Sequence, residues 1–592
     1  MVGRRGIIRV TREGDTLAAR AATIRMMLQG RERLLAVVVV GALLGMLVLP
    51  PLFFLTRGSL LVTADGSRSV WSLANFVGLF TERGFAASAW NSLVFAVGSA
   101  IVAIAIGGLN AWIAERTDAP FRPLAYLTTI ISLGTPYVLY VSAWLLLLNR
   151  SGPVNSWWRQ LTGDTQPLFN VYGMGGMILI EGLLWSPFVF LLLGATFRSS
   201  NLDYEEAARM SGAGLGSIIR RITLPLSLPA LAALALLVFI RALEAFEVPA
   251  LVGRPGRVHV LTTDIYEAMH VSSPPDLGRA SALSVVLLVV VAGLLAWYAR
   301  LVQNAEAFAT ITGKGFRPRP VPLGPWRPVA GAVLILNFVA LLVLPTLILV
   351  WASFLPFYQS FRWSAVSLMT LQNYAAVLDN PRYLQLLSNT LVVAAISATA
   401  VMMLTAVNAW LTVRKAKGAA VLDQLASLPL VFPGIVLGLG VMQLWLALPP
   451  IGIYGTIWIL VWAFAINYLP YGTRYSVAGM LQIHRELEEA AAASGATFAE
   501  TFRRVVLPLL LPSVVAGWLF IFLLGARSLS LPILLAGPQS QTMSVAMFDL
   551  WSNGQGPELA ALGLLWSGLM TAIAVLFYVV AQRTGGGIHG QQ

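Results

Sequence analysis

The chain has 592 residues, of which 57% are hydrophobic and only 11% are charged, and its formal net charge is +13. The apolar residues form long blocks rather than an amphipathic spacing, which is typical of a polytopic membrane protein. Cysteine is absent, which excludes disulfides, thiolate metal ligands and thiol nucleophiles. The chain has four histidines, so a histidine cluster is not expected, and we predict no metal site.

The chain begins with an arginine-rich stretch, residues 1–33, followed by the first apolar block. That block is too long for a signal peptide and no clear cleavage site follows it, so we expect a retained cytoplasmic tail. A bilayer core needs roughly 20 apolar residues per helix, whereas a closed barrel would show short alternating segments. The sequence supplies about twelve helical blocks: Leu34–Leu55, Leu93–Ala114, Leu124–Leu148, Gly173–Phe197, Leu228–Val252, Ala280–Leu301, Val329–Leu355, Leu387–Leu411, Val421–Leu448, Gly455–Gly479, Leu511–Leu535 and Leu559–Val580.

Lys and Arg are concentrated in the segments that a topology with a cytoplasmic N terminus places in the cytoplasm. The positive-inside rule therefore predicts a multi-pass membrane protein with both termini cytoplasmic. We expect its location to be the bacterial inner (plasma) membrane. We interpret the basic excess as topology and contact with the lipid bilayer, not as nucleic-acid binding. Trp112 and Trp410, at the cytoplasmic ends of their spans, are interpreted as interface anchors.

Short motifs recur along the chain at a nearly constant displacement. The pairs are Leu73–Phe76 with Leu371–Tyr374 and Asn110–Trp112 with Asn408–Trp410 at 298 residues, then Pro187 with Pro470 and Val248–Pro249 with Leu531–Pro532 at 283 residues. The single change of register falls at a long loop of the first half, Asn149–Tyr172, which is what duplication with one insertion predicts. We predict an all-α integral membrane fold of two tandem six-helix halves, 34–303 and 328–582, related by a pseudo-twofold axis along the membrane normal. A cytoplasmic linker, 304–327, would join them, and 583–592 would form a C-terminal tail.

The loop after the fourth block of each half carries one motif, with a glycine four residues after the second alanine and a Leu-Pro pair twelve residues after the glycine. Its members are Glu206, Ala207, Ala208, Gly212, Leu224 and Pro225 in the first copy and Glu489, Ala490, Ala491, Gly495, Leu507 and Pro508 in the second. Alanine and glutamate favour helix, and glycine favours a helix C terminus. In the second copy, Thr497 and Glu500 form a capping box that begins a new helix. We predict a helix, a glycine bend and a second helix.

This arrangement resembles the coupling loop, or EAA loop, of the membrane subunits of binding-protein-dependent ABC importers. The resemblance covers both halves and implies the type I importer permease fold, two cytoplasmic ABC ATPase subunits and an extracytoplasmic solute-binding protein. It also implies that Glu206 and Glu489 face the ATPases and that Gly212 and Gly495 form the bends. The sequence contains no G-x-x-x-x-G-K-[ST] loop, so we expect a non-enzymatic subunit without a cofactor, whose partner ATPase binds ATP and Mg²⁺.

Ionisable residues inside a span cost several kcal/mol unless they face a cavity or a partner, which makes them candidates for the translocation pathway or its gate. The fifth span contains Arg241, Glu244 and Glu247 at steps of three, along one side of the helix. The 283-residue displacement places Arg527 at the position of Glu244, so these two could pair across the channel, toward the outer side. Glu181, in the fourth span, is a further candidate. An Arg241–Glu244 pair that serves only packing remains the alternative.

Fused permeases of this length resemble the ferric-iron branch of the family, with the thiamine permease next. The stretch Leu243–Leu251, followed by Val260–Tyr266, looks like the iron type, and carboxylates suit a hard trivalent cation. The predicted function is therefore the permease of an ABC importer, with ferric iron as the expected solute. Thiamine, polyamine and phosphonate or sugar-phosphate remain alternatives for the same role. An ion-gradient-driven secondary transporter is the alternative from another class, but it would not need two matched Glu-Ala-Ala loops.

Overall fold

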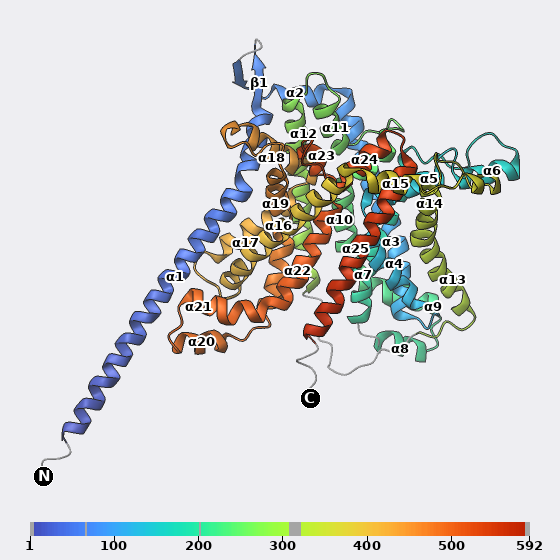
Figure 1. Cartoon of the computed structure of the whole chain (residues 1–592). Helices are drawn as coiled ribbons and strands as arrows, with labels where there is room; N and C mark the ends of the chain where they lie inside the picture. The colour runs from blue at the N-terminus through green and yellow to red at the C-terminus, as the bar shows by residue number, and fades with distance from the viewer. Residues whose placement is uncertain (1–4, 65–67, 200–202, 307–320, 586–592) are drawn as a thin grey trace.

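The computed structural model describes residues 5–64, 68–199, 203–306 and 321–585 (Figure 1). The helices of the first half are α1 Arg5–Leu60, α2 Ala74–Thr81, α3 Arg83–Arg116, α4 Arg122–Gly134, α5 Tyr137–Leu148, α6 Pro153–Thr162, α7 Met174–Ser199, α8 Asp203–Met210, α9 Leu215–Ile218, α10 Leu224–Leu243, α11 Leu261–His270 and α12 Leu277–Glu306. Those of the second half are α13 Arg327–Phe338, α14 Leu344–Ser353, α15 Gln372–Asp379, α16 Pro381–Val413, α17 Ala419–Ser427, α18 Gly434–Leu446, α19 Ile457–Met480, α20 Arg485–Ala493, α21 Phe498–Thr501, α22 Leu507–Arg527, α23 Pro532–Leu535, α24 Met543–Ser552 and α25 Gly556–Gly585. An antiparallel hairpin of β1 (Leu61–Ala64) and β2 (Arg68–Trp71) follows α1.

Nine helices in the described ranges are long and apolar enough to cross a membrane without a break. The predicted third span of each half is different, because it is bent by 114° in the first half and by 109° in the second. The bends lie at Pro136 and Pro433. Proline has no backbone N–H and disfavours helix in the residue before it, so each apolar block is divided into two short helices. Each of these two predicted spans is therefore a broken span rather than one continuous helix.

Helix α19 fills the place of the predicted tenth span. Its 24 residues extend about 36 Å, which is enough for a bilayer core. Asn467 and Arg474 lower its apolar character, so it is not among the nine. It packs along α16 as α7 packs along α3, and the interior prolines Pro187 and Pro470 confirm that the two helices correspond. The nine straight spans, the two broken spans and α19 together account for the twelve predicted blocks.

The first span of each half packs against the other half. Helix α1 packs against α18 of the second half as well as against α12, and α14 packs against α5 of the first half as well as against α25. One cluster of buried apolar residues runs through both halves and includes Phe246 and Phe548. The halves are therefore built as one body, and the exact domain boundaries stay predictions. Residues 307–320 of the predicted linker lie outside the described ranges.

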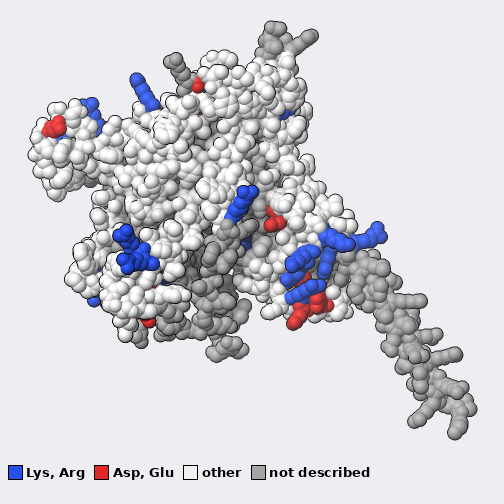
Figure 2. Space-filling model, turned by 180° about the vertical axis from the view of Figure 1, so that it is seen from behind, with Lys and Arg blue, Asp and Glu red and all other residues white. Residues whose placement is uncertain are grey.

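The short helices gather at opposite ends of the bundle (Figure 1). Helices α8, α9, α20 and α21 lie at one end, here called the loop end, whereas the β-hairpin, α2 and α11 lie at the other, here called the far end. Figure 2 shows a largely uncharged middle on one face, with Lys, Arg, Asp and Glu side chains gathered beside the base of α1, at the loop end. A charged end and an apolar middle are the distribution expected of a bundle that crosses a bilayer.

Candidate functional site

Both motif loops have the predicted geometry of a helix, a glycine bend and a second helix. In the first loop Gly212, with φ of 81°, separates α8 from α9, and in the second Gly495, with φ of 89°, separates α20 from α21. The residue after each glycine donates its N–H to the carbonyl of the second motif alanine, Ala208 or Ala491, at 3.0 Å. This is the Schellman pattern, in which glycine supplies the left-handed conformation that ends a helix.

The predicted capping box is present at the start of α21. The Glu500 carboxylate accepts a hydrogen bond from the Thr497 N–H at 2.9 Å, and the Thr497 hydroxyl accepts one from the Glu500 N–H at 3.3 Å. The second helix of this loop therefore has a defined starting point.

The Leu-Pro pairs join each loop directly to a span. Leu224-Pro225 follows the π-helical turn η1 (Ile219–Thr223), and Leu507-Pro508 follows the π-helical turn η8 (Phe502–Val506). Proline removes one N–H from the helix, and a π-turn accommodates this change without ending the helix. As a result, 215–243 forms one helix of 29 residues and 498–527 one of 30, each about 43 to 45 Å long. These two continuous helices are called the coupling rods below.

Sequence reasoning missed the glutamate that precedes each motif. Glu205 is 3% exposed; its carboxylate lies 3.7 Å from the Arg116 guanidinium of α3 and accepts a hydrogen bond from the Thr223 hydroxyl at 2.8 Å. Glu488 is 5% exposed and pairs at 2.7 Å with Arg414, the residue that follows α16. These buried contacts tie each loop to the transmembrane bundle. Arg116 and Arg414 are themselves 298 residues apart, so the repeat register could have identified them.

The predicted docking glutamates are less buried than the glutamates that precede them. Glu489 is exposed and pairs at 2.9 Å with Arg485, one helical turn away, and Glu206 is half-buried. Each loop therefore has one buried glutamate and one more accessible glutamate. Their role in contacting an ATPase stays a prediction.

The assignment of Trp410 as a membrane-interface anchor is wrong. Its side chain is 3% exposed, and its indole N–H donates a hydrogen bond to Glu488 at 2.8 Å. Its ring stacks on Phe498 at 4.1 Å and on Phe502 at 5.3 Å between centroids. Trp410 thus supports the second coupling loop, because a buried indole requires a hydrogen-bond partner and glutamate provides it. Trp112, in the first half, is half-buried.

All five predicted pathway residues line one cavity of about 190 Å³ between the halves. The first half contributes α5, α7, α10 and the segment after α10, and the second contributes the break before α18, α19, α22 and the segment after α22. Within this cavity the Ser530 hydroxyl donates a hydrogen bond to Glu247 at 2.9 Å. Glu247 and Ser530 are equivalent positions, 283 residues apart. Equivalent residues can touch only near the axis that relates the halves, so the cavity lies at that axis.

The charged side chains of the cavity have specific partners. Arg241 and Glu244 form an ion pair at 2.8 Å, as the packing alternative proposed, but both also face the cavity. The second oxygen of Glu244, Oε1, is buried without a hydrogen-bond partner. Arg527 donates a hydrogen bond to the Tyr137 hydroxyl at 3.1 Å and lies 4.6 Å from the centre of that ring. Glu181 accepts a hydrogen bond from the Trp185 indole at 2.9 Å.

Several cavity residues carried no signal in the sequence. Tyr137, Asn467, Tyr468 and Tyr471 line the cavity but are common residue types within apolar blocks. Tyr137 lines the cavity because the chain bends at the preceding proline. The length of the apolar block alone does not predict this bend. The predicted pairing of Glu244 with Arg527 across the channel stays a prediction, although both residues line the same cavity.

A third polar cluster lies at the far end. His259, Asp264 and Glu267 bring one nitrogen and two carboxylates together, with the donor atoms within 4.8 Å of one another. The sequence expectation of no metal site considered histidine clusters and did not anticipate one histidine beside two carboxylates.

Comparison with known proteins adds independent information. The model of the family "Binding-protein-dependent transport system inner membrane component" matches twice, at residues 103–306 and 403–584. A probable ABC transporter permease protein, y4fN of Sinorhizobium fredii, is 28% identical over 85% of this chain and 89% of its own. The ferric transport system permease protein FbpB of Actinobacillus pleuropneumoniae is 26% identical over 81% and 68%. The putrescine permease PotI of Escherichia coli is 28% identical over 45% and 93%.

A solved structure of a bacterial alginate ABC transporter in complex with its alginate-bound periplasmic protein matches 40% of this chain and 85% of its own, at 22% identity and a TM-score of 0.34. The two matches to the family model fall one in each half and together cover more than half of the sequence. The chain therefore belongs to the family of binding-protein-dependent transport system inner membrane components and is a fused ABC importer permease that carries two copies of the family domain.

Proposed function

We propose that this permease imports a cationic solute, with ferric iron as the leading candidate, through the cavity between its halves. The cavity presents three carboxylates, Glu181, Glu244 and Glu247, against two guanidinium groups. The unpartnered oxygen of Glu244 is the observation that carries the proposal, because a buried carboxylate oxygen without a donor favours a cation as ligand. Hard oxygen donors suit a hard metal ion, and the ferric name of the FbpB relative supports iron.

The alternatives differ in how well they fit this cavity. Polyamines and thiamine are also cations, and the putrescine permease is among the relatives. Phosphonate and sugar-phosphate are anions, which the carboxylates would repel. A secondary transporter has no support from the family match.

Energy would enter at the loop end. Two ABC ATPase subunits, which bind ATP and Mg²⁺, would dock on the more accessible glutamates of the two loops, and a solute-binding protein would dock at the far end. In this proposal, the loop end and both termini lie in the cytoplasm. The coupling rods support the proposal, because the first rod runs from the loop to within one residue of Glu244, and the second ends at Arg527. A movement of either loop would therefore reach the cavity along one continuous helix.

The test is uptake into proteoliposomes that contain the chain, its ATPase and its binding protein. We expect ATP-dependent uptake of ⁵⁵Fe³⁺, reduced at least about tenfold by Glu247→Gln, because one carboxylate interaction with a cation is worth more than about 1.4 kcal/mol. The control is Glu82→Gln, which changes an exposed carboxylate outside the cavity. ATP-dependent uptake of thiamine or putrescine without iron would contradict the assigned solute. Uptake driven by an ion gradient without ATP would contradict the transport class.

A further inference from the structure

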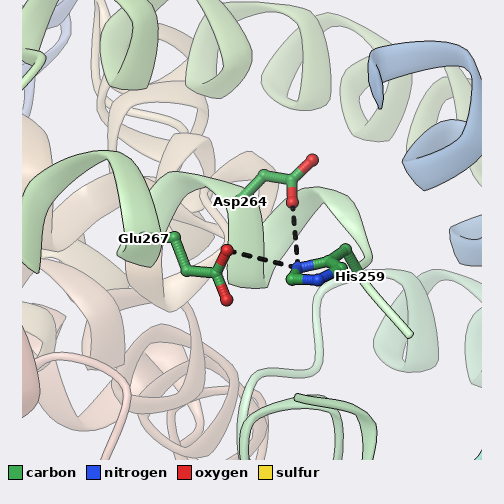
Figure 3. Close-up of side chains that lie close together, drawn as sticks. All are labelled: His259, Asp264 and Glu267. Carbon is green, nitrogen blue, oxygen red and sulfur yellow. Dashed lines mark ion pairs between the residues drawn. The ribbon is translucent and has the colours of Figure 1, made fainter. Parts of the chain in front are cut away.

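We propose that His259, Asp264 and Glu267 form a binding site for a first-row transition-metal cation at the far end of the bundle. The site is separate from the cavity between the halves, and its existence does not depend on which solute the cavity carries. Asp264 and Glu267 lie three residues apart on α11, so their side chains share one face of that helix. Figure 3 shows both carboxylates directed at the Nδ1 atom of His259, which lies just before the helix.

The distances suit a metal ion. Nδ1 of His259 lies 3.2 Å from a Glu267 oxygen and 3.8 Å from an Asp264 oxygen. A metal bound to nitrogen and oxygen at about 2.1 Å needs donor atoms about 3 to 4 Å apart. One imidazole and two carboxylates form a ligand set typical of iron, manganese and zinc, and they leave coordination positions open for water or an incoming ligand. The histidine is 41% exposed, so an ion can reach the site.

Neighbouring groups hold two of the three ligands in place. Arg254 donates a hydrogen bond to one oxygen of Glu267 at 3.0 Å, which leaves the other oxygen facing His259. The Asn91 amide donates to the His259 carbonyl at 3.0 Å and fixes the backbone there. Arg279, the other nearby cation, is engaged by Glu82 at 2.8 Å. Such outer contacts orient metal ligands and typically affect affinity by about 10 to 100-fold.

The second half provides an internal comparison. Helix α24 takes the place of α11 and also has ten residues, with Thr542 as N-cap where the first half has Val260. Aligned on these N-cap residues, which lie 282 residues apart and so one residue out of the 283-residue register, Gln541 replaces His259, Ala546 replaces Asp264 and Asp549 replaces Glu267. The second half therefore forms the same helix with only one of the three ligands. The cluster is therefore not required for this helix to form.

The cluster is connected to the cavity between the halves. The Thr262 hydroxyl, two residues before Asp264, donates a hydrogen bond to the carbonyl of Ala245 at 2.7 Å. Ala245 itself lines the cavity. A cation held by α11 would therefore lie on an element that contacts the cavity wall directly.

Binding of Mn²⁺ to the full chain in lipid nanodiscs at neutral pH tests this site. The variant His259→Gln with Asp264→Ala copies residues that the second half already accommodates, so it should fold. We expect wild type to bind one Mn²⁺ more than this variant, or to bind it at least about tenfold more tightly. His270→Ala, which removes a histidine from the same helix, should bind as wild type does.

Pulsed electron paramagnetic resonance on the same samples identifies the ligand. Wild type should show coupling of Mn²⁺ to one histidine nitrogen, and His259→Gln should lose it. Equal binding by wild type and the double variant would overturn the proposal. Absence of nitrogen coupling in wild type would also overturn it, because His259 would then only form ion pairs with the two carboxylates.

Discussion

At the scale of single residues, Glu205 and Glu206 are adjacent in the chain but face different environments. Glu205 is buried against Arg116, whereas Glu206 is half-buried. The same division separates Glu488 from Glu489. Burial gives the first glutamate of each pair a structural role, because removing one member of a buried ion pair leaves an uncompensated charge. Glu489 is exposed and Glu206 is half-buried, so both are more accessible for contact with another protein.

The Glu244→Ala substitution should leave Arg241 without its partner. We expect the free energy of unfolding to fall by about 3 kcal/mol, at the low end for a buried pair because the Arg241 side chain is still 23% exposed. Thermal unfolding of the purified chain measures this change. The double variant Arg241→Ala/Glu244→Ala should be more stable than the single variant. If the two are equally stable, the ion pair is not what Glu244 contributes.

The Gly212→Ala substitution should strain the bend of the first coupling loop. Gly212 has φ of 81° and no neighbouring atom within 4 Å of an added Cβ, so only backbone strain of about 1 to 2 kcal/mol is introduced. We expect a lower melting temperature and slower ATP-driven uptake. Gly216→Ala is the matched control, because that position is equally open but lies within helix α9. Equal effects of the two substitutions would rule out the left-handed bend as the cause.

At the scale of elements, each coupling loop is held from two sides. Its first helix is tied to the bundle by a buried glutamate, and its second helix continues without interruption into a coupling rod. The two anchors differ in detail, because Glu205 uses the hydroxyl of Thr223 and Glu488 uses the indole of Trp410. The loops are therefore equivalent in geometry but not in the groups that fix them.

The Glu488→Ala and Glu489→Gln substitutions should distinguish a residue that anchors the loop to the bundle from one that contacts the ATPase. Glu488→Ala leaves the Arg414 charge and the Trp410 indole without their partner, so we expect a loss of about 2 to 4 kcal/mol in unfolding free energy. Glu489→Gln should change stability by less than about 0.5 kcal/mol, because the residue is exposed. It should nevertheless reduce ATP-driven uptake. Melting temperature and uptake, measured on the same variants, distinguish the two roles. Unchanged uptake in Glu489→Gln would contradict a docking role.

Inserting two glycines between Ser217 and Ile218 should interrupt the first coupling rod. Glycine is a poor helix former, and the insertion falls between the loop and the span. We expect ATP hydrolysis by the complex to continue while uptake falls. The control is the same insertion between Gly163 and Asp164, which are exposed and lie outside the rod. Undiminished uptake with the interrupted rod would show that force does not travel along it.

At the scale of the whole molecule, the first span of each half packs against the other half, and the halves meet at a cavity on the axis that relates them. The cavity is asymmetric, since the position occupied by Glu244 in one half holds Arg527 in the other, and Glu247 is matched by Ser530. A fused chain permits such differences, because each half can change independently of the other. A permease made of two identical subunits would carry the same residue on both sides.

Much of this architecture follows from the sequence, for identifiable reasons. Block length predicted the spans, and local helix chemistry predicted the bends at Gly212 and Gly495. The breaks before Tyr137 and Gly434 escaped prediction, because a proline inside an apolar block can either bend a helix or end it, and only packing decides. The role of Glu205 was not predicted, because two adjacent glutamates are equivalent in the sequence and differ only in their burial. The His259 cluster escaped because its carboxylates become neighbours of the imidazole only once α11 forms.

We propose that both coupling loops transmit the energy of ATP hydrolysis to the one shared cavity. The most direct measurement is ATP-dependent solute uptake by reconstituted complexes that carry Glu206→Ala, Glu489→Ala or both substitutions, with ATP hydrolysis recorded in parallel. We predict that each single variant lowers uptake and that the double variant abolishes it, while the chain keeps its melting temperature. Full uptake in the double variant, with hydrolysis still coupled to transport, would contradict this account.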